Sequence, residues 1–129
     1  MPLEMTHIWL LVEDMPRALS FYRDTLGIEV LNDLGEFVEL RANANFQLSL
    51  FTRAAMLLDE PGITIGPIGG QHATLAFEVD GLDDYCAQLR AKGVTFISGE
   101  ANHPAWGLRT AFLLDPDGNL LCLYGGISA

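Results

Sequence analysis

Two stretches of the chain decide its fold: HIWLLVEDMPRALSFYRDTLGIEV, residues 7–30, and HATLAFEVDGLDDYCAQLRAKGVTF, residues 72–96. Each stretch begins with a histidine, runs through apolar residues to acidic ones, and continues at helical spacing to a glycine. The matched positions are His7 with His72, Glu13 with Glu78, Asp14 with Asp80, and Gly27 with Gly93. Such self-similarity predicts that the chain contains two copies of one structural unit.

Each copy is predicted to start as a strand and to continue as a helix. The runs 5–12 and 72–79 are short, rich in β-forming residues and bounded by acidic and turn residues. In the first copy, Asp14 is placed to cap a helix, and Pro16 lies in the first turn, where its missing N–H costs little. Gly27 suits the left-handed residue that ends many helices.

The second helix is predicted to begin at an Asp80 cap and to end at Gly93. Apolar residues recur at helical spacing in both helices. They are Met15, Ala18, Leu19, Tyr22 and Leu26 in the first, and Leu82, Tyr85, Cys86 and Leu89 in the second. Cys86 is therefore interpreted as a core residue without a chemical role.

Three further strands follow each helix, so each copy is a βαβββ module. The predicted strands lie at 28–33, 36–42 and 46–52, and at 94–98, 108–114 and 119–125. The turn DPDG, residues 115–118, joins the last two. The fold class is α+β, with two tandem βαβββ modules. We expect residues 1–129 to form a single domain, with modules at 5–52 and 71–125 and a linker loop at 53–70.

Composition narrows the possible partners. The chain has 129 residues, half of them apolar, and a formal net charge of −10. This charge argues against nucleic acid and anionic membranes as partners, because both are negative. The N-terminus lacks the positive charge and the long apolar run of a signal peptide, and two cysteines make no disulfide framework. We expect a cytoplasmic, reduced protein.

The paired βαβββ design and the ending PAWGLRTAFLLDPDGNLLCLYG, residues 104–125, resemble the vicinal oxygen chelate superfamily. That superfamily includes glyoxalase I, extradiol dioxygenases, fosfomycin-resistance enzymes, methylmalonyl-CoA epimerase and bleomycin-resistance binding proteins. The resemblance runs from His7 to about Tyr124 and implies that each module curls its mixed sheet into a cup. It does not indicate one activity, because the family spreads many functions over one scaffold.

The resemblance also implies where metal ligands would lie. Metal-dependent members take them from the first and last strands of each half, which points to His7 and His72 here. The last-strand position of the second half, usually Glu, is Cys122. Aligning LSL with LCL puts Ser49 at the fourth position, with Gln47 as a substitute ligand if the register is shifted by two residues.

The donor set limits the choice of cofactor. Two His and a Cys suit Zn²⁺, whereas Ni²⁺, Fe²⁺ and Mn²⁺ fit less well once the carboxylate is lost. A metal-free pocket is equally consistent, since Ser and Cys are small residues that remain when a ligand site decays. Ordinary glyoxalase I activity is not expected, because the last-strand Glu residues that would move the proton are absent.

The remaining pocket walls are predicted from strand alternation and from nearby residues. These candidates are Trp9, Phe51, Trp106, Arg109 and Tyr124. Trp and Arg together could hold a flat or anionic ligand by stacking and charge. The alternative is that the aromatic residues belong to the core and that Arg109 pairs with an acidic neighbour. His103, beside Pro104, is interpreted as a loop residue.

Two hypotheses for the function follow. The first is a divalent-metal-dependent lyase, isomerase or dioxygenase-like enzyme that uses His7 and His72 with Cys122 or Gln47. The second is a metal-free protein of the bleomycin-resistance type that sequesters a small cationic compound. Both imply a small-molecule ligand and a homodimer, since relatives pair their modules within or between chains.

Overall fold

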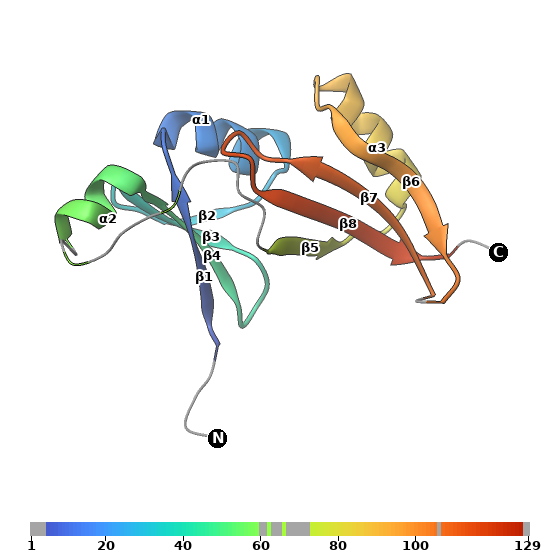
Figure 1. Ribbon diagram of the computed structural model, residues 1–129, viewed down its shortest axis with the longest axis horizontal. Coiled ribbons are helices and arrows are strands. Elements are labelled where there is room, and N and C mark those ends of the chain that lie inside the picture. Colours follow the sequence, from blue (N-terminus) through green and yellow to red (C-terminus); the bar gives the residue numbers. More distant parts are fainter. Residues whose placement is uncertain (1–4, 60–61, 63–65, 67–72, 106, 128–129) are drawn as a thin grey trace. The chain divides into compact units, whose positions relative to one another are not determined.

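The computed structural model divides the chain into two units, residues 1–66 and 67–129. Each unit is described by itself (Figure 1). The described residues are 5–59, 62, 66, 73–105 and 107–127. Among them, none of the helices combines the length and the hydropathy that a bilayer crossing needs.

The first unit is a βαβββ module. Its elements are β1 (His7–Val12), α1 (Met15–Leu19), η1 (Ser20–Thr25), β2 (Val30–Asp33), β3 (Phe37–Arg41), β4 (Gln47–Thr52) and α2 (Arg53–Asp59). The strands form one four-stranded sheet in the order β1-β4-β3-β2. β1 runs parallel to β4, and the other neighbours are antiparallel.

The second unit repeats this topology. Its elements are β5 (Thr74–Glu78), α3 (Leu82–Ala91), β6 (Phe96–His103), β7 (Leu108–Leu114) and β8 (Leu120–Gly126). The sheet order is β5-β8-β7-β6, with β5 parallel to β8. Two mixed four-stranded sheets, each a βαβββ module, confirm the predicted α+β class.

The first helix begins as predicted, and the second does not. The Asp14 carboxylate accepts a hydrogen bond from the Arg17 N–H at 3.0 Å, and Pro16 lies in the first turn. After Leu19 the helix widens into π-helix η1. In the second unit the residue before the helix is Gly81, with φ +65°, so the predicted Asp80 cap is wrong. A left-handed glycine there moves the helix start one residue beyond the aspartate.

Two further boundaries differ from the sequence prediction. The segment 53–70, expected to be a linker loop, opens with helix α2. Strong helix formers such as Ala54 and Ala55 follow Thr52, whose hydroxyl accepts from the Ala55 N–H at 3.2 Å. Strand β6 extends past the predicted 94–98 to His103, with register shifts along it.

One face of each sheet packs on a helix. In the first sheet the buried side chains of that face include Val38, Leu40, Leu48 and Leu50, and α1 contacts β4. In the second sheet they are Ala111, Leu113, Leu121 and Leu123, and α3 contacts β6, β7 and β8 (Figure 1). Cys86 is fully buried on α3, as a core residue should be. The opposite face of each sheet is left for a site.

The first core can be tested with two identical substitutions. Leu50 is fully buried on β4, whereas Leu58 on α2 is 83% exposed. Leu50→Ala should lower the free energy of unfolding by about 2–5 kcal/mol, because it leaves a cavity. Leu58→Ala should change it by about 0.5 kcal/mol or less. Urea unfolding measures both, and equal effects would contradict this assignment of the core.

Candidate functional site

The first sheet carries a mixed aromatic and polar face opposite its helix. Strand register sets its members, because Trp9 and Glu39 both lie beside Ser49, from β1 and β3 respectively. Side chains alternate along a strand, so every second residue shares that face. We call it the aromatic face, and its residues are His7, Trp9, Leu11, Phe37, Glu39, Arg41, Gln47, Ser49 and Phe51.

Three rings form a cluster on the aromatic face. The Trp9 centroid lies 5.4 Å from that of Phe37 and 6.1 Å from that of Phe51, and the two Phe centroids are 5.3 Å apart. All three pairs are edge-to-face, which is a favourable arrangement. Trp9 is nevertheless 55% exposed. Sequence reasoning missed Phe37, although the alternation in EFVELRA would have placed it with Glu39 on one face.

At the centre of the aromatic face lies a buried hydroxyl group that lacks a hydrogen-bond partner within the described part of the chain. Ser49 is fully buried, and its Oγ has no hydrogen-bond partner among the residues that the structure describes. A buried hydroxyl without a partner is costly, so such atoms usually serve a purpose or meet a group from outside the chain. Glu39, on the neighbouring strand, keeps 26% of its side chain exposed.

His7 is held by hydrogen bonds at both ring nitrogens. Its Nε2 lies 2.9 Å from Oε1 of Gln47, and its Nδ1 lies 2.7 Å from the Thr6 hydroxyl. Since a carbonyl oxygen only accepts, this pattern assigns the proton to Nε2 and makes Nδ1 the acceptor. Glu39 Oε2 is 3.6 Å from Nε2, which is too long for a hydrogen bond. Both ring nitrogens are therefore engaged in hydrogen bonds within the chain.

Cys122 lies on the face of the second sheet that points away from α3. Ala76 of β5 and Phe112 of β7 lie beside it. Cys122 is 8% exposed, and burial raises the pKa of its thiol. Tyr124 shares this face by alternation, and His103 donates or accepts a hydrogen bond at 2.9 Å with the Thr110 hydroxyl. His103 is the last residue of strand β6, so its interpretation as a loop residue is wrong.

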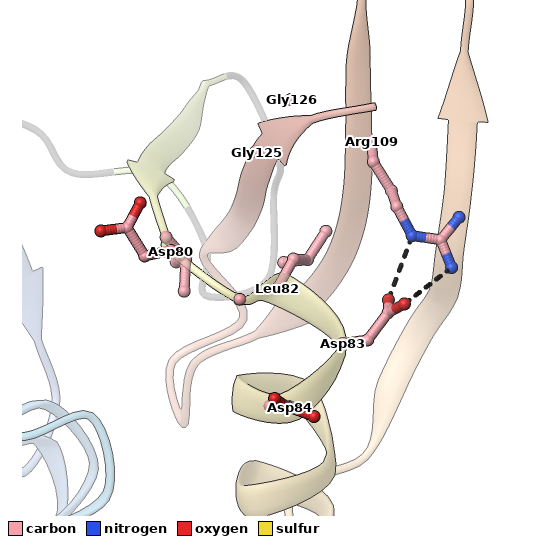
Figure 2. Close-up of a pocket in the computed structure, with 9 residues that line it drawn as sticks. Asp80, Leu82, Asp83, Asp84, Arg109, Gly125 and Gly126 are labelled. Atoms are coloured by element: carbon pink, nitrogen blue, oxygen red, sulfur yellow. Dashed lines mark hydrogen bonds and ion pairs between the residues drawn. The ribbon is translucent and has the colours of Figure 1, made fainter. Parts of the chain in front are cut away.

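Arg109 does not share the face of Cys122 and Tyr124. Its register partner is Gly125, which faces α3, where a Cβ would come within 4.0 Å of Leu82. The Arg109 guanidinium donates to Asp83 at 3.0 Å, as Figure 2 shows, and to Asn102 at 3.1 Å. Arg109 and Tyr124 therefore lie on different faces of the second sheet, and Arg109 pairs with an acidic neighbour, as the alternative prediction held.

Arg109 lines a different depression, at the start of α3 (Figure 2). Asp80, Asp83 and Asp84 give this depression an acidic wall, and Gly125 and Gly126 form part of the other side. Among the described residues that line the depression, the basic side chain is Arg109, and its ion pair with Asp83 neutralises its charge. The depression lies on the helix side of the second sheet, away from Cys122.

The strand register decides which positions of the two modules correspond. Trp9 lies beside Ser49, and Ala76 lies beside Cys122. If Ser49 corresponds to Cys122, as the sequence predicts, then His7 corresponds to Thr74, two residues after His72. The predicted matches of His7 with His72 and of Ser49 with Cys122 therefore cannot both hold. His72 and Trp106 lie outside the described residues.

The described side chains can be checked for their ability to bind the divalent metals that some members of the superfamily use. Within the described part of the chain, no group of three or more His, Cys, Asp or Glu side chains is arranged to hold an ion. In the first sheet, the neutral Ser49 hydroxyl and the His7 ring, hydrogen-bonded at both nitrogens, are poor ligands compared with the carboxylates, thiolates and free imidazoles that divalent metals take.

Comparison with known proteins defines the family. The model of the Glyoxalase/Bleomycin resistance protein/Dioxygenase superfamily matches residues 4–123. The chain therefore belongs to this superfamily, as its paired modules and its DPDGN ending predicted.

Its relatives include proteins with and without a stated role. The uncharacterized protein YraH of Bacillus subtilis is 28% identical over 126 residues, which cover 95% of this chain and 98% of YraH. A superfamily member from Sphaerobacter thermophilus is 29% identical, covers 95% of this chain and 97% of its own, and has a TM-score of 0.75. TnmS3, an antibiotic binding protein from Streptomyces sp. CB03234, is 27% identical, with coverage of 98% and 99% and a TM-score of 0.73.

The state of the cysteines can be tested by alkylation. Burial raises the pKa of Cys122, and it raises that of Cys86 to about 11. Because a raised pKa keeps the unreactive thiol form to higher pH, the native protein should react with iodoacetamide at least about tenfold more slowly at neutral pH than the urea-unfolded chain. Mass spectrometry identifies the labelled residue. Rapid native labelling of Cys122 would contradict its assignment as a buried thiol.

Proposed function

We propose that this chain is a metal-free small-molecule-binding protein that takes a flat aromatic compound on the aromatic face of its first sheet. The observation that carries the proposal is the ring cluster of Trp9, Phe37 and Phe51, in which Trp9 remains 55% exposed. A large indole held by two neighbouring rings and open to solvent offers stacking area with little side-chain entropy left to lose.

The energetics favour an aromatic ligand. Burying apolar surface contributes about 25 cal/mol per Å², and a well-placed aromatic pair adds about 0.5–1.5 kcal/mol beyond that area. Phe37 and Phe51 hold the Trp9 ring edge-on, so its position is set before the ligand arrives. Such preorganisation reduces the entropic cost of binding.

The hypothesis of a metal-dependent lyase, isomerase or dioxygenase receives less support. Both last-strand positions lack the carboxylate that would act as a base, since they carry Ser49 and Cys122. His7 is engaged in two hydrogen bonds. The likeness to TnmS3, described as an antibiotic binding protein, supports the binding hypothesis and suggests sequestration of a toxic compound as the role.

The proposal includes a homodimer. β1 and β5 each lie at an edge of their sheet. An exposed edge strand has unpaired backbone groups that a second chain or module can cover. Light scattering of the purified protein would measure the mass directly.

The proposal predicts ligand binding that depends on Trp9. In a thermal-shift screen of flat aromatic compounds with EDTA present, hits should raise the melting temperature of the wild type, because a ligand that binds only the native state stabilises it. Trp9→Ala should weaken the affinity for these hits about tenfold, as expected when about 1.4 kcal/mol of stacking is lost. Calorimetry measures the affinities.

The matched control is Ile97→Ala, which removes another exposed apolar side chain, on β6. It should leave the affinities unchanged within about twofold. The absence of any hit, or hits that bind Trp9→Ala as tightly as the wild type, would contradict the proposed function.

A further inference from the structure

We propose, building on the proposed function, that the aromatic face selects compounds carrying a protonated amine, and that Glu39 is the residue that recognises the charge. The ring of the ligand packs on Trp9, and its ammonium group donates to the Glu39 carboxylate beside Ser49. Glu39 lies on β3, which is neither the first nor the last strand of its module, where the family's metal ligands lie.

Glu39 is placed centrally and lacks a close donor. It lies in the middle of β3, two residues from Phe37 on the same face and directly beside Ser49 of β4. Its Oε2 lies 3.6 Å from Nε2 of the His7 imidazole, and that nitrogen donates its proton to Gln47 instead. Only 26% of the Glu39 side chain is exposed, so a charged donor from a ligand would replace water that the carboxylate has lost.

Ser49 provides a second, independent observation. Its Oγ is fully buried and without a partner among the described residues, although it lies between Trp9 and Glu39 in the register. A hydroxyl both accepts and donates, so once a ligand displaces the side chains that cover it, Ser49 can accept one N–H of an ammonium group whose other N–H is donated to Glu39. An ammonium group has three donors, which matches this pair of acceptors.

The other charged groups nearby do not cancel the negative charge. Arg41 shares the strand and the face of Glu39, but its Nε donates to Glu29 at 3.0 Å, so its charge is already paired. The rings of the cluster present negative π faces that also attract cations. The formal net charge of −10 adds a long-range attraction for a cation and a repulsion for an anion.

The test uses three compounds that share one ring system and differ in charge: 1-naphthylmethylamine, 1-naphthylmethanol and 1-naphthoate. Calorimetry with the full chain should show the amine binding about tenfold or more tightly than the alcohol, as expected for charge-assisted hydrogen bonds, and the anion binding most weakly. Glu39→Gln should weaken amine binding about tenfold while changing alcohol binding less than about twofold.

The control is Asp24→Asn, which changes the net charge equally but lies on η1, in an ion pair with Arg23. It should leave the preference for the amine intact, which separates a local carboxylate from the overall charge. Urea unfolding of Glu39→Gln checks that the variant folds, and Glu39→Asp, which keeps the charge, should retain part of the preference.

Two outcomes would overturn the inference and are distinguishable from failure of the proposed function. If the alcohol or the anion binds as tightly as the amine, or if Glu39→Gln keeps the preference, the cation assignment is wrong while aromatic binding stands. If none of the three binds but hits from the screen still require Trp9, the inference fails and the proposed function survives. If no hit requires Trp9, both fail.

Discussion

The pairing of β1 with β4, and of β4 with β3, is the constraint on which the site depends. This register places Trp9 and Glu39 on either side of Ser49, and strand alternation then divides the first sheet into two faces. Leu48 and Leu50 point into the core on the side of α1, and Ser49 between them lies on the aromatic face. A slip by one residue would bury the polar set and expose the leucines.

The two modules share a topology but not a site. The face of the first sheet combines three rings with Glu39 and His7, whereas the corresponding face of the second sheet carries Cys122 among apolar neighbours such as Ala76 and Phe112. The two modules therefore share the same strand order, while the side chains on their sheet faces differ. This is why a family match to residues 4–123 identifies the fold and not the ligand.

Much of the fold, and part of the site, could be predicted from the sequence. Local signals sufficed for the Asp14 cap and for the shared face of Trp9 with His7, because both follow from residues close in the chain. Arg109 was misplaced because its face depends on which β8 residue it pairs with, and a single strand does not specify that register. Glu39 was missed for the same reason, since its importance comes from lying beside Ser49 of another strand.

The most direct test of a metal-free aromatic site is calorimetric titration of Zn²⁺, Ni²⁺ and Mn²⁺ into tag-free protein stripped with a chelator, with His7→Ala as the comparison. Because the ring nitrogens of His7 are both hydrogen-bonded and Ser49 offers only a neutral hydroxyl, we expect no saturable uptake near one ion per chain that depends on His7. Stoichiometric binding in the wild type, lost in His7→Ala, would contradict it and restore the metal-dependent enzyme as the better hypothesis.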